Sequence, residues 1–368
     1  NTTPTTLPQW LSKQTASHQK YLQSTLEQRE YYRAVVRSFY PRQLQPPPEI
    51  PRPLFEYYSI ASGCHPDNSN KNRYRDIKPY DRTRVVVAGL ALDRESPIHC
   101  CPNQRYLNAS WVQERYGHKW WIASQAPLPT TAHAYLSLIL QPITLPLSPP
   151  ETPPSTRVRT VVQLTQLIEG GRRKADSYFP ARVGQSLVHA PERSYPGPPL
   201  VTTLLDSVRI PEACCVKSTV SISLQGQDSG ESPVTFQHLL FTAWPDQGVP
   251  KREERKHLMA FLHLVDSTNR QGSEGADTDP PVVVGCSAGI GRTGTFIALS
   301  SLLRAYGFLP AAPPSPPLSL LSPLGPLPSA FDEDLVGQEV DWLREQRHRM
   351  VQQDSQLALI YSLLEAAF

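Results

Sequence analysis

A predicted strand that runs into a predicted helix through a tight loop constrains the fold of this chain more than any other feature. Residues 282–284 are three valines, as in a buried strand, and Thr-Phe-Ile-Ala-Leu at 295–299 is typical of a helix. Between them, residues 286–292 read Cys-Ser-Ala-Gly-Ile-Gly-Arg. Small residues let successive backbone N–H groups point inward, and the helix directs its positive dipole end at the same place. This unit predicts a cradle for a phosphate group.

Two side chains of this loop have the chemistry to act on a bound phosphate. The planar fork of Arg292 grips two phosphate oxygens at once. The same positive surroundings lower the pKa of Cys286, which makes it a candidate thiolate nucleophile. The amides that would hold the phosphoryl oxygens belong to Ser287, Ala288, Gly289, Ile290 and Gly291.

Residues 289–294 also match G-x-G-x-x-G, the pattern of dinucleotide-binding turns. That interpretation requires an acidic residue about 20 positions further on, to hold a ribose hydroxyl. The stretch near 314 is rich in proline, and no Asp or Glu follows until Asp332. Nucleotide binding is therefore not favoured.

The 368 residues could form one large α/β domain or two small ones, and one domain is favoured. The 39 prolines are clustered, and the apolar pattern resumes on both sides of each cluster. We expect an N-terminal helix and a proline-rich connector over residues 1–53, packed on a catalytic domain over 54–368. Insertions are predicted at about 141–157 and 305–331.

Hydrophobic periodicity predicts most of the regular elements. Helices are expected at about 17–38, 130–140, 251–266, 333–347 and 353–367. Strands are expected at 84–87, 106–112, 119–123, 158–164, 201–210, 215–224 and 234–242.

Charge and cysteine content narrow the class of protein. A net charge of +3 does not mark a nucleic-acid binder, and no apolar run approaches the ~20 residues of a membrane span. The N-terminus is polar, unlike a signal segment. The six cysteines resemble neither a disulfide framework nor a zinc site, so a cytoplasmic, intracellular protein is expected. The chain opens with Asn, as a segment of a longer protein would.

A second motif supplies an acid. Trp-Pro-Asp at 244–246 places Asp246 on a loop bounded by proline and glycine, the composition of a movable flap. A carboxyl group there suits protonation of the leaving oxygen when a thiolate attacks a phosphate ester.

Together with Lys-Asn-Arg-Tyr-Arg-Asp at 71–76 and Met-Val-Gln-Gln-Asp-Ser-Gln at 350–356, these motifs resemble those of the classical, tyrosine-specific protein tyrosine phosphatases. The matches occur in the family order from about 71 to 361. The resemblance implies a single phosphatase-like α/β domain, with a highly twisted mixed β-sheet flanked by α-helices and carrying the proline-rich insertions.

The resemblance also implies roles for individual residues. Asp246 would be the general acid and then the base for water, Gln352 would position that water with help from Gln356, and the Thr293 hydroxyl would bond the cysteine sulfur. Tyr74 would form the aromatic wall of a deep pocket, and Asp76 would bond the substrate backbone. Lys174 resembles the lysine that pairs with the flap aspartate. The implied reaction is hydrolysis of phosphotyrosine in partner proteins through a cysteinyl-phosphate, without metal or cofactor.

One position departs from the family pattern. The residue before the nucleophile is normally His, held by a tyrosine that matches Tyr178, and here it is Gly285. If the pKa of Cys286 rose to the free value of ~8.5, only about 3% would be thiolate at pH 7. We expect weakened activity that climbs toward pH 8, until Asp246 is no longer protonated enough to act as the acid. The alternative is a phosphatase-like domain that binds phosphotyrosine proteins with little or no turnover.

The proline-rich stretch raises a further alternative. Residues 309–328 contain several P-x-x-P spacings, which in a polyproline II conformation bind proline-reading domains. A tolerated surface insertion is the other interpretation, and neither excludes catalysis.

Overall fold

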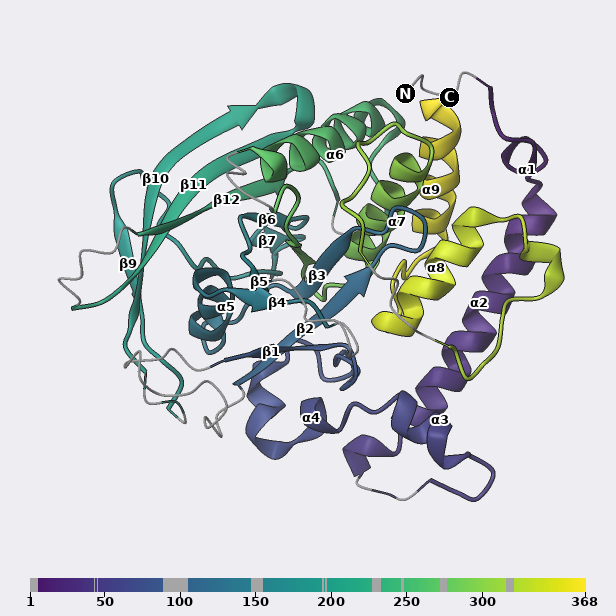
Figure 1. Cartoon of the computed structure of the whole chain (residues 1–368), viewed down its shortest axis with the longest axis horizontal. Helices are drawn as coiled ribbons and strands as arrows, with labels where there is room; N and C mark the ends of the chain where they lie inside the picture. Colours follow the sequence, from purple (N-terminus) through teal and green to yellow (C-terminus); the bar gives the residue numbers. More distant parts are fainter. Residues whose placement is uncertain are drawn as a thin grey trace.

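A mixed sheet forms the centre of the protein (Figure 1). The computed structural model describes residues 6–42, 44, 46–88, 105–146, 155–193, 195, 197–226, 233–245, 248–271, 277–315 and 321–368. Within them, the spatial order of the sheet is β1 (Arg84–Val87), β2 (Arg105–Gln113), β3 (Trp120–Gln125), β13 (Val282–Cys286), β6 (Thr160–Gln163), β12 (Val234–Phe241), β11 (Cys215–Leu224), β10 (Leu200–Ile210) and β9 (Ser186–His189). The four strands from β3 to β12 run parallel, and the outer pairs are antiparallel.

Helices cover both faces of this sheet (Figure 1). One face packs on α6 (Arg255–Arg270), α7 (Gly291–Ala305), α8 (Leu335–Gln346) and α9 (Asp354–Ala367), and the other packs on α5 (Ala132–Leu140). Since side chains alternate along a strand, Val282 and Val284 of β13 lie in the first core and Val283 in the second. Burial on both faces explains the continuous apolar run in this strand. The predicted α/β fold is confirmed.

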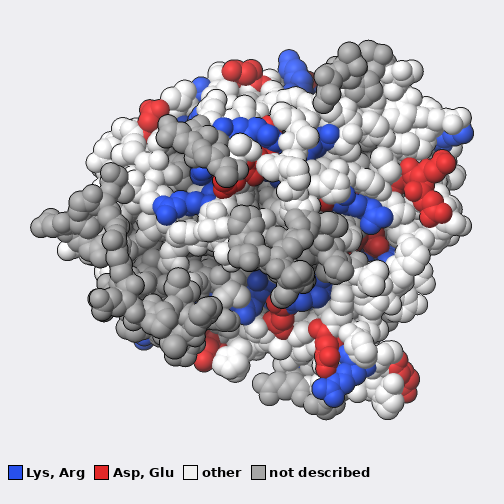
Figure 2. Space-filling model, viewed as in Figure 1, with Lys and Arg blue, Asp and Glu red and all other residues white. Residues whose placement is uncertain are grey.

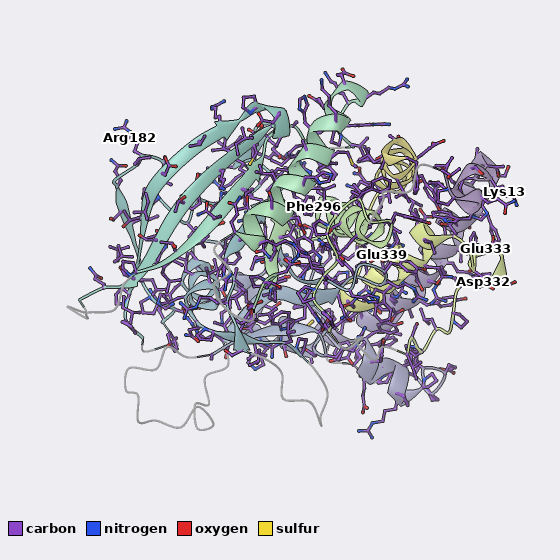
Figure 3. The ribbon with its side chains drawn as sticks, turned by 45° about the horizontal axis from the view of Figure 1, so that its top comes forward. Lys13, Arg182, Phe296, Asp332, Glu333 and Glu339 are labelled. Atoms are coloured by element: carbon purple, nitrogen blue, oxygen red, sulfur yellow. The ribbon has the colours of Figure 1, made fainter. Side chains whose placement is uncertain are left out.

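The interior holds both apolar and charged side chains. Phe296 and Glu339 lie among the helices in Figure 3, whereas Lys13 and Arg182 lie at the rim. Basic and acidic side chains are interspersed on the face shown in Figure 2. None of the described helices is both long and apolar enough to cross a membrane.

Several short elements were not predicted from the sequence. They are α1 (Gln9–Ser12), α3 (Arg52–Tyr57), α4 (Ala61–Cys64) and the antiparallel pairs β4 (Ile143–Thr144) with β5 (Ser155–Thr156) and β7 (Ile168–Glu169) with β8 (Arg172–Arg173). β9 was also missed, because its largely exposed residues show no alternation. The predicted loop at 141–157 therefore has paired strands at its ends.

The longest N-terminal helix, α2 (Ala16–Arg37), lies beside α8 (Figure 1). Arg29 donates to both carboxylate oxygens of Asp341, at 3.0 and 2.9 Å, and Arg33 pairs with Glu345. Leu22 of α2 enters the main core. Buried bidentate pairs of this kind fix the orientation of the helix.

The described residues of the second proline-rich insertion, at 305–331, are hydrogen-bonded to the rest of the domain. Arg304 donates to the Pro310 carbonyl, Trp120 Nε1 to Ser315 Oγ at 2.8 Å, and Arg29 Nη2 to the Gly325 carbonyl at 2.7 Å. Leu309 and Leu327 are buried. The described residues of 308–330 contain no α-helix and no strand, and a short 3-10 helix begins at Ser329.

Candidate active site

The loop between β13 and α7 forms a cradle at the C-terminal edge of the parallel strands. Gly289 adopts a φ of +70°, and a Cβ there would lie 2.2 Å from the Ser124 carbonyl oxygen of β3. Only glycine meets both conditions. Arg347 fixes the loop from behind, because its guanidinium donates to the carbonyls of Gly289 at 2.7 Å and of Ala288 at 3.0 Å. The backbone N–H groups of Ile290 and Thr293 are directed at the Cys286 sulfur.

Cys286 ends β13 at the floor of this cradle and is buried. Burial alone would raise the pKa of its thiol. The Thr293 hydroxyl, the charge of Arg292 and the backbone N–H groups of Thr293 and Ile290 outweigh burial and hold that pKa below its usual value. The Thr293 oxygen has no hydrogen-bond partner among the described nitrogen and oxygen atoms, so its hydrogen is available to the sulfur. The thiol is set up to ionise.

Arg292, in the first turn of α7, is held in a fixed plane. Its Nη1 and Nη2 donate to the two oxygens of Glu169 at 2.8 and 2.9 Å. Further bonds run to the carbonyls of Leu164, at 2.9 Å, and Pro245, at 2.7 Å. Glu169 was not predicted from the sequence. A buried arginine needs hydrogen-bond acceptors, but the sequence does not show which distant residue supplies them.

The rim of the cradle carries the residues expected to recognise the substrate. The Ser287 hydroxyl donates to the Lys174 carbonyl at 2.7 Å, so the Tyr74 hydroxyl, 2.8 Å away, is the donor to Ser287. Tyr74 is thereby fixed beside the cradle. Asp76 is exposed, and its carboxylate lies 3.5 Å from the guanidinium of Arg349.

The two predicted glutamines approach from the loop before α9. The side-chain oxygen of Gln356 accepts from the backbone N–H groups of Gln352 at 3.0 Å and Gln353 at 3.1 Å. A Cβ on Gly291 would lie 3.0 Å from the Gln356 amide, so the small residue permits this approach. The Gln352 side chain is exposed at the opening of the site.

A cavity of about 220 Å³ brings these groups together. Its lining includes Tyr74, Asp76, Glu169, Lys174, Cys286, Ser287, Ala288, Ile290, Gly291, Arg292, Gln352 and Gln356. Thr293 and Gly289 are not part of this lining. A larger hollow of about 560 Å³, lined partly by α2, shares Asp76 and Gln352 with it.

Asp246 lies outside the described residues. On either side of it the chain is bonded to the site: Trp244 is buried, the Pro245 carbonyl accepts from Arg292, and the Gly248 N–H donates to Gln353 at 3.2 Å.

Gly285 sits where the structure leaves no room for a side chain. A Cβ at this position would lie 2.7 Å from the Ser124 carbonyl oxygen, the same atom that contacts Gly289. The Tyr178 hydroxyl, expected to hold a histidine there, interacts with Tyr135 instead. The lowered pKa of Cys286 arises without an imidazole at 285.

The sequence of this chain is similar to those of known proteins. Residues 68–307 match the family model described as "Protein-tyrosine phosphatase". The chain is 34% identical over 270 residues to human receptor-type tyrosine-protein phosphatase zeta, covering 68% of this chain and 10% of that protein. It is 30% identical over 315 residues to mouse receptor-type tyrosine-protein phosphatase C, covering 86% of this chain and 19% of that protein. The chain thus spans about a tenth to a fifth of the length of these relatives.

Proposed function

Because the chain belongs to the protein-tyrosine phosphatase family, we propose that it hydrolyses phosphotyrosine in proteins through a cysteinyl-phosphate. The observation that carries this proposal is Cys286, whose pKa is lowered within a ring of loop amides and beside a guanidinium held in one plane. That combination suits a thiolate attacking a phosphorus whose oxygens carry negative charge.

In the first step the Cys286 sulfur attacks phosphorus, and the bond from phosphorus to the tyrosine oxygen breaks. Asp246 gives its proton to that leaving oxygen. Arg292 and the amides of 287–292 bind the three equatorial oxygens, which carry the charge of the transition state. Support comes from the bonds that orient Arg292 and from the flap residues on either side of Asp246, which are bonded to the site.

In the second step water attacks the cysteinyl-phosphate. Asp246 takes a proton from the water, the phosphorus–sulfur bond breaks, and inorganic phosphate leaves. Gln352 would orient this water and Gln356 would hold the Gln352 backbone, consistent with the 3.0 Å bond between them. The Thr293 hydroxyl stabilises the departing thiolate.

The rim would select the substrate. Tyr74, fixed through Ser287, would form the wall of a pocket deep enough for phosphotyrosine, and Asp76, which also lines the cavity, would accept a backbone N–H of the peptide. Lys174, which also lines the cavity, would pair with Asp246. An intracellular site of action stays a prediction, favoured by free thiols at the four described cysteines, Cys64, Cys214, Cys215 and Cys286.

The proposal does not extend to proline-reading domains. Such domains read an accessible polyproline II segment, whereas carbonyls and side chains at Pro310, Ser315 and Gly325 are bonded to the domain.

The test is phosphate release from a phosphotyrosine peptide between pH 5 and 8.5. Cys286→Ser should abolish turnover, and Cys214→Ser, a half-buried thiol outside the site, should leave it unchanged. Peptide binding without turnover would instead support the alternative, a phosphotyrosine-binding domain, for which Gly285 is the specific observation. Turnover that survives Cys286→Ser would contradict the mechanism.

A further inference from the structure

Glu169, the partner of Arg292, is itself held by the segment that precedes it. Its Oε1 atom accepts from the Thr165 hydroxyl and from the Gln166 backbone N–H, each at 2.9 Å, in addition to Arg292 Nη1 at 2.8 Å. Thr165 is 1% exposed, so water does not compete for its hydroxyl. Three donors converge on one oxygen of a buried carboxylate, and they leave it a single orientation.

The chain of bonds continues behind Thr165. The Gln163 side-chain N–H donates to the Thr165 carbonyl at 2.7 Å. This bond turns the Gln163 Oε1 atom toward His238 Nε2, which lies 3.1 Å away. Burial lowers the pKa of His238 to about 3, so the imidazole is neutral at any working pH. Because Gln163 Oε1 can only accept, Nε2 must carry the hydrogen. A continuous series of hydrogen bonds therefore connects His238 of β12 with Arg292 through Gln163, Thr165 and Glu169.

This series lies beside the position that lacks a histidine. Gln163 of β6 is the register partner of Gly285, and the Leu164 N–H donates to the Gly285 carbonyl at 2.8 Å. The strand that ends in Cys286 and the segment that orients Glu169 are thus joined directly. Polar support for the cradle comes from the neighbouring strands, where Gly285 has no side chain to supply it.

We propose that Thr165 is a positioning residue for phosphate binding, which acts through Glu169 by holding its carboxylate in the plane that orients Arg292. Gln163 and His238 hold Thr165 in turn. The inference rests on the proposed function, because it takes the cradle to be a phosphate site.

The test uses tungstate, a tetrahedral oxyanion, whose dissociation constant is measured by calorimetry alongside kcat and KM for a phosphotyrosine peptide. Thr165→Val removes the hydroxyl and keeps the shape, and Thr165→Ser restores the hydroxyl. The matched control is Thr160→Val at the start of β6, the strand that precedes Thr165; Thr160 is fully buried, and its hydroxyl has no partner among the described residues. Because a hydrogen bond to a carboxylate is among the stronger ones, we expect Thr165→Val to raise the dissociation constant for tungstate about tenfold.

The dissociation constant of Thr165→Ser for tungstate should stay within about twofold of the wild-type value, and that of Thr160→Val should equal it. In the double variant, Thr165→Val should cause no further loss of tungstate binding beyond that of Glu169→Gln alone. Tungstate binding unchanged in Thr165→Val, or a loss that adds in full to that of Glu169→Gln, would overturn the proposal. A melting temperature for each variant separates misfolding from misplacement, and Thr165→Ala serves if the valine variant does not fold. A wild type that binds tungstate without turnover refutes the proposed function alone, and one that binds no tungstate refutes both.

Discussion

Restoring the family histidine should damage this protein. The Cβ of any residue at 285 would lie 2.7 Å from the Ser124 carbonyl oxygen, and that carbonyl also lies against Gly289, so it has little room to retreat. Gly285→His therefore forces β3 and β13 apart next to the nucleophile. Overpacking of this kind costs about 1–3 kcal/mol of unfolding free energy. With an unfolding entropy of about 2.1 cal/mol/K per residue, the melting temperature of a chain this long falls by roughly 1–4 °C.

Activity should fall as well, because Cys286 follows directly and a displacement of about 1 Å in a cradle costs up to a hundredfold in rate. We expect kcat/KM for a phosphotyrosine peptide to drop at least tenfold across pH 5 to 8.5. Gly285→Ala is the matched control: it carries the clashing Cβ without the imidazole, and it should show most of the loss of stability. A histidine variant as stable as the wild type, with a higher kcat/KM at neutral pH, would refute the steric argument.

Three further outcomes are expected. Thr293→Ala removes a hydrogen bond to the thiolate, so the pKa of Cys286 should rise and the pH dependence of alkylation by iodoacetamide should shift to higher pH; an unmoved profile would contradict the assignment. Burial raises the pKa of Glu339 to about 8, so its contribution to stability is complete below pH ~4.5 and is lost as pH rises toward 8. Glu339→Gln should flatten that decline of the melting temperature, and an identical decline in both proteins would exclude this carboxyl as its source. Arg29→Met leaves the buried Asp341 with one partner fewer and should lower the unfolding free energy by about 3 kcal/mol in urea titrations, whereas a change below about 0.5 kcal/mol would show that α2 does not depend on this pair.

Much of the fold was readable from periodicity. The long helix expected at 17–38 is α2 at 16–37. The strands expected at 201–210, 215–224 and 234–242 match β10, β11 and β12 within a residue at each end. These elements are long enough for burial to impose a clear pattern on their sequence. The pairs β4–β5 and β7–β8 are two residues per strand, and β9 is exposed, so none carries a pattern that could be read.

The sequence by itself determined the cradle, because its parts are consecutive residues whose local geometry follows from small side chains, one strand end and one helix start. Only the tertiary structure decided what surrounds it. Glu169 meets Arg292 across 123 positions of sequence, and the Ser124 carbonyl closes on Gly285 from a neighbouring strand. Such contacts depend on which strands become neighbours and in which register, and no local pattern encodes that choice. For the same reason the sequence could show that the histidine is absent, but only the fold shows that its place is filled by backbone.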